Sequence, residues 1–418
     1  MTPSAFDTEL QLRLEALRGA GLYRELRDIA SAQSPRIISQ GREYLNFSSN
    51  DYLGLANDPV LKEAAVRAIM DFGTGSGASR LICGSLAPHQ RLEDILAQFK
   101  GVEAALTFSS GYAAAQGTLG ALLGNDDIII LDKLSHACLV DAARLCGAKL
   151  RVFAHNDLED LERILKWADQ RPHPQGSTGR RLIVTESVFS MDGDHAPLRE
   201  LVNLKEKYGA WLMVDEAHAT GLYGAKRRGL AEGLGVAGQV EIQMGTLGKA
   251  LGAAGGYIAG SRSLIDYLIN RARSFIFSTA PTPAAAAAAS AGVRLVQSSD
   301  GEFRCKCLWE RVTGLAAIAP LSGHVSGKTA SLRSAIVPIH VGDERAAVAT
   351  AATLREQGIW IPAIRYPTVA RGEARLRLTL TAAHSAADLA QLKSALENLK
   401  PVSAAVASTT GISDQCTR

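Results

Sequence analysis

The sequence has no long apolar run and no leader pattern. Its most uniform nonpolar stretch, residues 284–289, is a short alanine tract that is too weakly hydrophobic to cross a membrane and favours the start of a packed helix. The start of the chain, MTPSAFDTE, contains no basic region followed by an apolar one, so no secretory signal is predicted. We therefore expect a cytoplasmic protein without membrane contact.

The sequence also has little net charge and no paired cysteines. The formal charge of +3 comes from 45 basic and 42 acidic residues that form no basic cluster, which argues against nucleic acid as a partner. No Cys-x-x-Cys pattern occurs, and Cys305-Lys-Cys307 alone is a weak metal signal, so we expect a reduced protein without a metal. The six cysteines lie at positions 83, 138, 146, 305, 307 and 416.

What the sequence does contain is a lysine among small residues, with no acidic side chain within several positions. Lys249 lies in MGTLGKALGAAGG, residues 244–256, where glycines lack Cβ atoms and let a flat ligand approach the backbone. An amine in a dry, crowded pocket shifts toward its neutral, nucleophilic form, as a Schiff-base lysine requires. A solvated lysine in a glycine-rich loop is the plain alternative. A phosphate-binding P-loop is excluded, because Gln243 replaces its first glycine and Ala250 its Ser or Thr.

An aspartate and a histidine upstream support the Schiff-base interpretation. The run AWLMVD, residues 210–215, predicts a buried strand of a parallel sheet, and Asp215 and His218 then lie at its carboxyl end, where such sheets bind ligands. A buried aspartate needs a positive partner, and the protonated pyridine nitrogen of pyridoxal 5′-phosphate (PLP) is one. Helix capping by Asp215 and a surface position for His218 are the alternatives. The order Asp, His and Gly-flanked Lys favours a PLP site.

A serine-rich turn offers a place for the cofactor's phosphate. The residues SSGY at 109–112 end a predicted strand and open a helix, and unpaired N–H groups at a helix start attract phosphate. We expect Gly111 and Tyr112 at this phosphate. Simple capping by Ser109 or Ser110 explains the turn equally well without the lysine, and the lysine favours the phosphate.

Three polar side chains complete the predicted cofactor site. His136 follows a strand and is placed to stack on the pyridine ring, Ser190 to reach the phenolic oxygen, and Thr246 to hold the phosphate. A histidine packed at a strand end and a serine in a turn are the alternatives for His136 and Ser190. Ser278 and Thr279 are candidates for a phosphate contact from a neighbouring subunit.

Apolar strands alternate with helical patterns, which predicts an α/β protein with a mainly parallel sheet covered by helices. Strands are expected at residues 105–108, 128–131, 150–153, 182–185, 211–214, 242–244 and 257–259, with helices such as 111–123, 158–170 and 198–208 between them. A smaller α+β unit follows, with strands at 334–341, 358–364 and 374–380 and a helix at 386–399.

These elements predict four parts of the chain. We expect an N-terminal helical segment at 1–48 with one or two helices in 8–30, a large PLP-binding domain at 49–285, a small C-terminal domain at 286–400 and a disordered tail at 401–418. Residues 172–180 are rich in Pro, Gly and Ser and predict a surface loop.

Two patterns are rejected as chance matches. The glycines of residues 233–238 fit a dinucleotide fingerprint, but no strand precedes them and no acidic residue follows at the expected distance. His155, Asp157 and Asp160 match no metal-ligand spacing, and helix capping by Asn156 or Asp157 is favoured.

Taken together, these motifs resemble the α-oxoamine synthases, which are PLP enzymes of fold type I. The resemblance covers about residues 17–399, and it is carried by NFSSNDYLGL, GSGASRLICGS, Ser135-His136, ESVFSMDGD, VDEAHATG, GTLGKA and ARLRLTLTAAH. It implies the fold type I architecture, an acyltransferase reaction and a homodimer with shared active sites. RYPTVARGEARLRLTLTAAH and FSMDGDHAPL resemble the branch that joins L-alanine to a pimeloyl thioester more than the branches that use glycine.

The resemblance also implies a role for each candidate residue of the cofactor site. Lys249 would be the Schiff-base lysine, Asp215 the partner of the pyridinium nitrogen, and His136 the residue that stacks on the ring and borders the substrate. The remaining implied cofactor contacts are Ser190 and His218 on the oxygen side of the ring, with Gly111, Tyr112 and Thr246 around the rest of the cofactor.

Three further residues would bind the substrates. Arg365 resembles the arginine that grips the amino-acid carboxylate, a task that suits a bidentate guanidinium. Thr368 and Arg24 resemble contacts to the acyl substrate, and Arg18 and Arg27 compete with Arg24 for that role.

Other functions stay open at this point. A glycine C-acetyltransferase or a 5-aminolevulinate synthase would use the same fold and cofactor. A catalytically silent partner subunit is disfavoured by Lys249, and a PLP-sensing regulator by the absence of a basic helix-turn-helix segment in the sequence. Either coenzyme A or a carrier protein would carry the acyl group.

Overall fold

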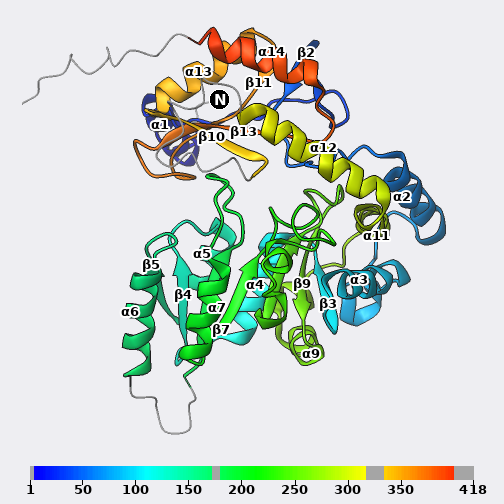
Figure 1. The fold of residues 1–418 in the computed structure, drawn as a ribbon, viewed down its shortest axis with the longest axis vertical. Coiled ribbons are helices and arrows are strands. Elements are labelled where there is room, and N and C mark those ends of the chain that lie inside the picture. Colours follow the sequence, from blue (N-terminus) through cyan, green and yellow to red (C-terminus); the bar gives the residue numbers. More distant parts are fainter. Residues whose placement is uncertain (1–3, 172–178, 317–333, 400–418) are drawn as a thin grey trace, which may run out of the picture.

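The computed structural model describes residues 4–171, 179–316 and 334–399 and has the predicted α/β architecture (Figure 1). The predicted tail at 401–418 and most of the predicted loop at 172–180 lie outside the described residues. A seven-stranded sheet with its covering helices forms the large domain, and two three-stranded sheets with further helices form the small domain above it in Figure 1. The predicted domain boundaries remain a prediction.

All seven predicted strands of the large sheet are confirmed. Their order is β3-β9-β8-β7-β6-β4-β5, and every neighbouring pair is parallel except those of β9, which runs antiparallel to β3 and β8. Their bounds are β3 (Ala104–Phe108), β4 (Ile128–Asp132), β5 (Lys149–Phe153), β6 (Arg181–Glu186), β7 (Trp211–Asp215), β8 (Ile242–Thr246) and β9 (Gly256–Gly260). The carboxyl ends of the parallel strands therefore meet at one edge, where ligands bind in such sheets.

Helices cover both faces of this sheet, as the apolar strands require. One face packs against α4 (Gly111–Leu122), α5 (Ala137–Leu145), α9 (Arg262–Arg271) and α10 (Arg273–Ile276). The other packs against α6 (Leu158–Asp169), α7 (Leu198–Lys207) and α8 (Leu230–Gly233), and α3 (Ala87–Lys100) and α11 (Pro283–Gln297) pack together beside β3. The short turns are η1 (Arg80–Gly84) and η2 (Ala237–Gln239), and α2 (Pro59–Phe72) lies on α11.

The small domain differs from its prediction at one strand. Its antiparallel sheet has the order β10-β13-β12, made of β10 (Ile336–Gly342), β13 (Ala374–Thr379) and β12 (Ala363–Ile364), with helices α12 (Ser299–Ala316), α13 (Glu344–Glu356) and α14 (Ala386–Glu397). The single strand predicted at 358–364 is wrong, because it is split into β12 and β11 (Ile359–Trp360). Pro362 lies at the break, and proline has no N–H to continue a strand ladder.

The N-terminal part joins the small domain through its strands. β11 runs parallel to β2 (Arg42–Asn46), which pairs antiparallel with β1 (Arg36–Ser39). One helix precedes them, α1 (Ala5–Gly19), and the chain leaves it near Gly21, whose φ of 69° favours glycine. The leucines that suggested an amphipathic helix are all exposed in this chain.

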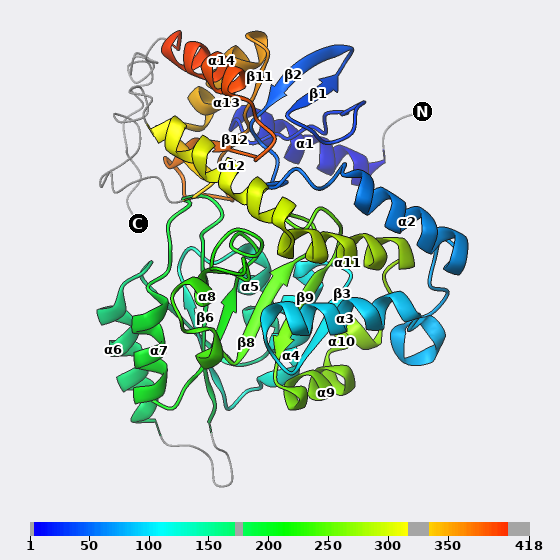
Figure 2. The ribbon, with the colours of Figure 1, turned by 45° about the vertical axis from the view of Figure 1, so that its right-hand side comes forward.

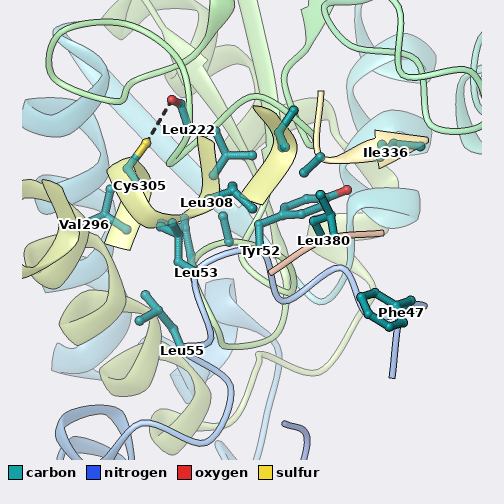
Figure 3. Close-up of a cluster of buried hydrophobic side chains, with 14 of the residues drawn as sticks. Phe47, Tyr52, Leu53, Leu55, Leu222, Val296, Cys305, Leu308, Ile336 and Leu380 are labelled. Carbon is teal, nitrogen blue, oxygen red and sulfur yellow. Dashed lines mark hydrogen bonds between the residues drawn. The ribbon is translucent and has the colours of Figure 1, made fainter. Parts of the chain in front are cut away.

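A continuous hydrophobic core links the two domains. Figure 3 shows Leu308 of α12 between Leu222 of the large domain and the pair Tyr52 and Leu53, and the same cluster includes Ile336 of β10. Figure 2 shows α12 running from α11 on the large domain up to the small domain. The small domain is therefore fixed against the edge where the parallel strands end.

A buried ion pair accounts for the acid next to Asp215. Glu216 accepts a hydrogen bond of 2.6 Å from Lys100 Nζ, and both side chains are only 1% exposed. Its other carboxylate oxygen accepts from the backbone N–H of Ala231 at 2.9 Å. Glu216 is thereby satisfied, which leaves Asp215 as the carboxylate of this turn that faces the strand edge.

Candidate active site

Lys249 lies in the connection between β8 and β9, at the carboxyl edge of the sheet. Its Nζ is 2.7 Å from Nε2 of His218. Burial lowers the pKa of the lysine to about 8, although the nearby carboxylates of Asp215 and Glu186 act in the opposite direction. The amine is therefore much closer to its neutral form than an ordinary lysine is, as a nucleophile or base requires.

His218 is a neutral imidazole held between two polar groups. Burial and the charges of Lys249 and Arg377 lower its pKa well below the ordinary value. Its Nδ1 lies 2.6 Å from the hydroxyl of Tyr52, and its Nε2 contacts Lys249. The imidazole is thus fixed beside the amine, and the surface position considered for His218 is wrong because the residue is 6% exposed.

Asp215 is a buried carboxylate at the end of β7. Burial raises its pKa, and the charge of Lys249 opposes that shift. One carboxylate oxygen accepts the backbone N–H of Ala217 at 2.9 Å. Helix capping does not account for the residue, because the turn after it leads into no α-helix before α8. A buried anion of this kind favours a cationic ligand atom beside it.

Glu186 is a site residue that the sequence analysis missed. It ends β6 and is the register partner of Asp215 on the adjacent parallel strand β7. Burial, together with the charge of Asp215, raises its pKa to about 8. The available signal was its place directly after the strand predicted at 182–185, at the same edge as Asp215.

His136 caps the start of α5. Its Nδ1 accepts the backbone N–H of Cys138 at 3.2 Å, and its own backbone N–H donates to Oε1 of Glu186 at 2.5 Å. Burial lowers the pKa of the imidazole, so the ring favours its neutral form. The ring is fixed at the same edge of the sheet as Asp215 and Lys249, whose charges act on its pKa.

Arg377 of β13 reaches the site from the small domain, and it too was missed. Its Nε donates to the backbone oxygen of Ser190 at 2.6 Å, and its Nη1 donates to Oδ1 of Asn50 at 3.0 Å. The guanidinium is buried, and its charge lowers the pKa of both Lys249 and His218. The two partners that lie closest to it are neutral, so its charge is available to an anionic ligand group. Ser190 itself is buried, as a cofactor contact would be.

The start of α4 lies against β9 through two glycines. A Cβ on Gly256 would lie 2.5 Å from the backbone nitrogen of Gly111, so this approach requires glycine. Ser110 caps the helix by accepting the N–H of Ala113, which confirms the capping role considered for it. Tyr112 is partly exposed, and its hydroxyl donates to Asp141.

Thr246 lies at the end of β8, three positions before Lys249. Its hydroxyl donates to the backbone oxygen of Gly255 at 3.0 Å and accepts the N–H of Gly248 at 3.2 Å. The side chain therefore orders the turn that carries the lysine.

Arg24 and Arg365 form a second group of positive charge. Nη2 of Arg24 donates to the backbone oxygen of Tyr366 at 3.1 Å, and Arg365 donates to the backbone oxygen of Tyr23. Burial and the charge of Arg24 lower the pKa of Arg365. Its Nε is buried and makes no hydrogen bond within the described residues. Two guanidinium groups held together by carbonyl oxygens form a ready anion site.

Thr368 lies in the same turn of the small domain as Arg365. Its backbone N–H donates to the Arg365 oxygen at 3.0 Å, and its side chain is exposed. The structure thus brings Lys249, Asp215, His218 and His136 together at one edge, and places Arg24, Arg365 and Thr368 together in a separate group.

The comparisons with known proteins identify the family. The sequence model of the family described as aminotransferase class I and II matches residues 42–396. The chain belongs to this family. It is 49% identical over 386 residues to an 8-amino-7-oxononanoate synthase of Geotalea daltonii, an alignment that covers 92% of this chain and 96% of the relative. A second relative with the same name, from Anaeromyxobacter dehalogenans, is 48% identical over 393 residues, with 93% and 95% covered.

Solved structures share the same fold. A serine palmitoyltransferase of Sphingomonas wittichii superposes with a TM-score of 0.85 at 31% identity, covering 95% of this chain and 97% of the other. A serine palmitoyltransferase solved with PLP gives a TM-score of 0.86 at 28% identity, with 94% and 98% covered. An 8-amino-7-oxononanoate synthase of Francisella tularensis gives 0.69 at 27% identity, with 85% and 96% covered.

The residues at the sheet edge fit PLP. Asp215 is a buried carboxylate suited to a pyridinium nitrogen, and Lys249 is an amine with a lowered pKa suited to an aldehyde. The buried hydroxyl oxygen of Ser135 has no hydrogen-bond partner within the described residues, so a polar ligand atom would satisfy it. Gly256 of β9 lets the start of α4 pack close to this edge, because a Cβ there would lie 2.5 Å from the backbone nitrogen of Gly111.

Two other classes of site do not occur in the described part of the chain. Among residues 4–171, 179–316 and 334–399, no three His, Cys, Asp or Glu side chains are grouped so as to hold a metal ion. No helix in these ranges has the length and hydropathy needed to cross a membrane. The pattern at residues 155–160 instead contains Asp157, which caps α6.

His155 connects the end of β4 to the loop that carries Ser190, through contacts with Asp132 and Asp194. Its Nδ1 is 3.0 Å from Oδ1 of Asp132 at the end of β4, and its Nε2 is 2.7 Å from Oδ2 of Asp194. The ring also packs edge-on against Phe189, with centroids 4.4 Å apart. Burial opposes a charge on this histidine, but the hydrogen bonds to the two aspartates raise its pKa to about 10.

We predict that His155→Asn changes how stability depends on pH. A folded-state pKa of about 10, above the ordinary 6.5, means that the charged histidine stabilises the fold fully below pH 6.5 and that this stabilisation is lost as the pH rises through 10. The variant should lose about 1.5–3 kcal/mol below pH 6.5, the worth of charged hydrogen bonds, and less at higher pH. Urea unfolding over a pH series measures the difference.

The exposed pair of Arg13 and Glu9 provides a matched control for this experiment. Arg13→Gln should shift the unfolding free energy by at most about 0.5 kcal/mol at every pH. A difference between the parent and His155→Asn that stays constant over the whole pH range would contradict a charged His155.

Proposed function

We propose that this protein catalyses the PLP-dependent decarboxylative condensation of L-alanine with a pimeloyl thioester. The products are 8-amino-7-oxononanoate, carbon dioxide and free coenzyme A or carrier protein, a step of biotin biosynthesis. The observation that carries the proposal is the buried Lys249 amine, with its pKa of about 8, beside Asp215 at the sheet edge of a chain 49% identical to a synthase of this name.

Each residue of the cofactor site has a defined task in this proposal. When bound, the cofactor supplies an electron-withdrawing ring that takes up the negative charge left when a proton leaves the α-carbon of alanine. The Asp215 carboxylate would pair with the ring nitrogen and favour its protonated form. The His136 imidazole would stack on the ring, and the His218 and Ser190 side chains would contact its oxygen.

The remaining cofactor contacts hold the phosphate. The backbone N–H groups at the start of α4, at Gly111 and Tyr112, would bind it at the positive end of the helix. The hydroxyl of Thr246 orders the turn before Lys249 and is the third proposed contact.

Lys249 moves the proton. Its Nζ removes the α-proton of alanine, so that the carbon can attack the thioester carbonyl and release the thiol. The β-keto acid then loses carbon dioxide, and Nζ can return the proton to the same carbon. A positioned base of this kind contributes roughly 10²–10⁴-fold to the rate, and it works best when its pKa lies near the working pH.

The arginines divide between the two substrates. The sequence resemblance assigned Arg365 to the alanine carboxylate. Arg377 is the alternative for that role. Its charge lowers the pKa of Lys249, so it lies near the amine that must reach the α-carbon of alanine. We propose that Arg377 binds the alanine carboxylate and that Arg24 and Arg365, with Thr368 beside them, hold the far carboxylate of the pimeloyl chain. The shared positive charge of that pair would select a dicarboxylic acyl group.

Other members of the family are the second candidates. A glycine C-acetyltransferase or a 5-aminolevulinate synthase would prefer glycine and a shorter acyl group. Offering alanine and glycine with acetyl, succinyl and pimeloyl thioesters separates these activities. The five cysteines of the described residues are free, which supports the proposal that the reaction takes place in the reducing cytoplasm.

We predict that Lys249→Ala abolishes covalent attachment of the cofactor. Borohydride reduction of the parent protein with PLP should label one peptide at position 249, found by mass spectrometry, and the variant should carry no label. Product formation should fall by at least roughly 10²-fold, because the base is lost. The exposed lysine variant Lys226→Ala should match the parent. A label elsewhere, or none in the parent, would rule out the proposed function.

We predict opposite substrate effects for the two small-domain arginines. Replacing a bidentate guanidinium by lysine loses charged hydrogen bonds worth about 1.5–3 kcal/mol each, which corresponds to roughly 10- to 100-fold in KM. Arg377→Lys should raise KM for alanine, and Arg365→Lys should raise KM for the pimeloyl thioester but not for the uncharged heptanoyl thioester.

The exposed Arg163→Lys is the matched control and should leave both KM values unchanged. A rise in the KM for alanine alone in Arg365→Lys would return that arginine to the role given by the sequence resemblance.

We further propose a homodimer whose partner covers one face of this chain. Met70, Leu81, Ile82 and Phe277 are 50–80% exposed, which is costly for large apolar side chains gathered near one glycine-rich loop. Ser278 and Thr279 follow Phe277 and would then reach the neighbouring active site.

We predict a solution mass twice the 44.3 kDa of one chain by light scattering. The variant Ile82→Asp should shift the protein toward the single-chain mass, because a charge would replace a buried apolar contact. A parent protein with the mass of one chain at all concentrations would contradict the dimer.

A further inference from the structure

Two buried carboxyl groups lie side by side beneath the proposed cofactor. Glu186 and Asp215 are register partners on adjacent parallel strands, and their exposed fractions are 2% and 5%. Two negative charges this close in a buried site repel each other, so the pair holds a proton near neutral pH. The proposed function uses Asp215 and gives Glu186 no task.

The surroundings decide which of the two acids keeps the proton. Asp215 has the positive charge of Lys249 acting on it and accepts the N–H of Ala217. Glu186 is buried beside Asp215, and these two causes raise its pKa to about 8. Other charged or titratable groups also act on this cluster. They are His136 at the cap of α5, Cys138 and Asp141 of α5, Asp132 of β4, Glu216 after β7, His218, and Arg377 of β13.

Glu186 also holds the residue proposed to lie on the ring. Its Oε1 accepts the backbone N–H of His136 at 2.5 Å, and that N–H stands at the cap of α5. This bond fixes the turn from which the imidazole projects. A neutral carboxyl group makes the same bond through its carbonyl oxygen, so holding His136 does not require a negative charge.

We propose that Glu186 is a positioning residue that works as an uncharged acid. It orients His136 through the backbone and leaves Asp215 as the single negative charge opposite the ring nitrogen. The inference rests on the proposed function. It adds to that function a physical cause for a loss of activity at alkaline pH. Ionised Glu186 would place a second negative charge near Lys249 and draw a proton onto Nζ, which removes the free amine.

Glu186→Gln separates charge from shape. Glutamine keeps an acceptor oxygen in the same place and cannot ionise. With PLP and both substrates, the variant should keep kcat/KM within about twofold of the parent below pH 8, and it should lack the decline that the parent shows as the pH rises through 8. The matched variant Glu186→Leu removes the acceptor and should lose about 3- to 10-fold in kcat at every pH.

A second readout needs no cofactor. A folded-state pKa of about 8, above the ordinary 4.5, means that the apoprotein loses stability as the pH rises from 4.5 to 8. The Tm of Glu186→Gln should fall less over this range than the Tm of the parent. Lys249 does not interfere with this measurement. Its lowered pKa changes the stability between about pH 8 and pH 10.5, and there the stability rises with pH.

Two results would overturn the inference. One is a Gln variant that loses more than about tenfold in kcat/KM below pH 8, because the charge would then be needed. The other is a Gln variant whose activity and Tm follow the same pH dependence as the parent. Borohydride labelling at position 249 distinguishes these outcomes from failure of the proposed function, since the label should persist in Glu186→Gln.

Discussion

The burial of charge at the carboxyl edge of β7 is the constraint on which the site depends. Asp215 has been removed from water, and the acid beside it in the chain is already paired with Lys100. Lys249 is half-buried, and the burial of its amine lowers its pKa to about 8. Neither group would be perturbed on a solvated surface. The large sheet and its helices therefore shift the pKa values of one amine and its neighbouring acids by excluding solvent from them.

The architecture explains why these groups meet. Neighbouring parallel strands bring their carboxyl ends to the same edge, so Glu186 and Asp215 become neighbours although they lie far apart in the sequence. The core around Tyr52 and Leu308 then fixes the small domain above that edge (Figure 3). As a result Arg377, more than a hundred residues after Lys249, donates to the loop of Ser190.

The sequence was sufficient for the large sheet, because buried parallel strands are short apolar runs bounded by polar turns. It also predicted that Asp215, His218 and Lys249 would meet, since all three follow such strands. It failed at residues 358–364, where two-residue strands pair with partners far away in the chain. It missed Glu186 and Arg377 because their roles depend on strand register and on domain packing.

The two domains contribute different kinds of group to the site. The large domain provides the amine, the two acids and the two imidazoles, whereas the guanidinium groups of Arg365 and Arg377 belong to the small domain. In the proposed function, the large domain would retain the cofactor and the small domain would capture the substrates. A change confined to the small domain would then leave a protein that binds the coloured cofactor but no longer catalyses the reaction. The visible colour alone would therefore be a poor measure of activity.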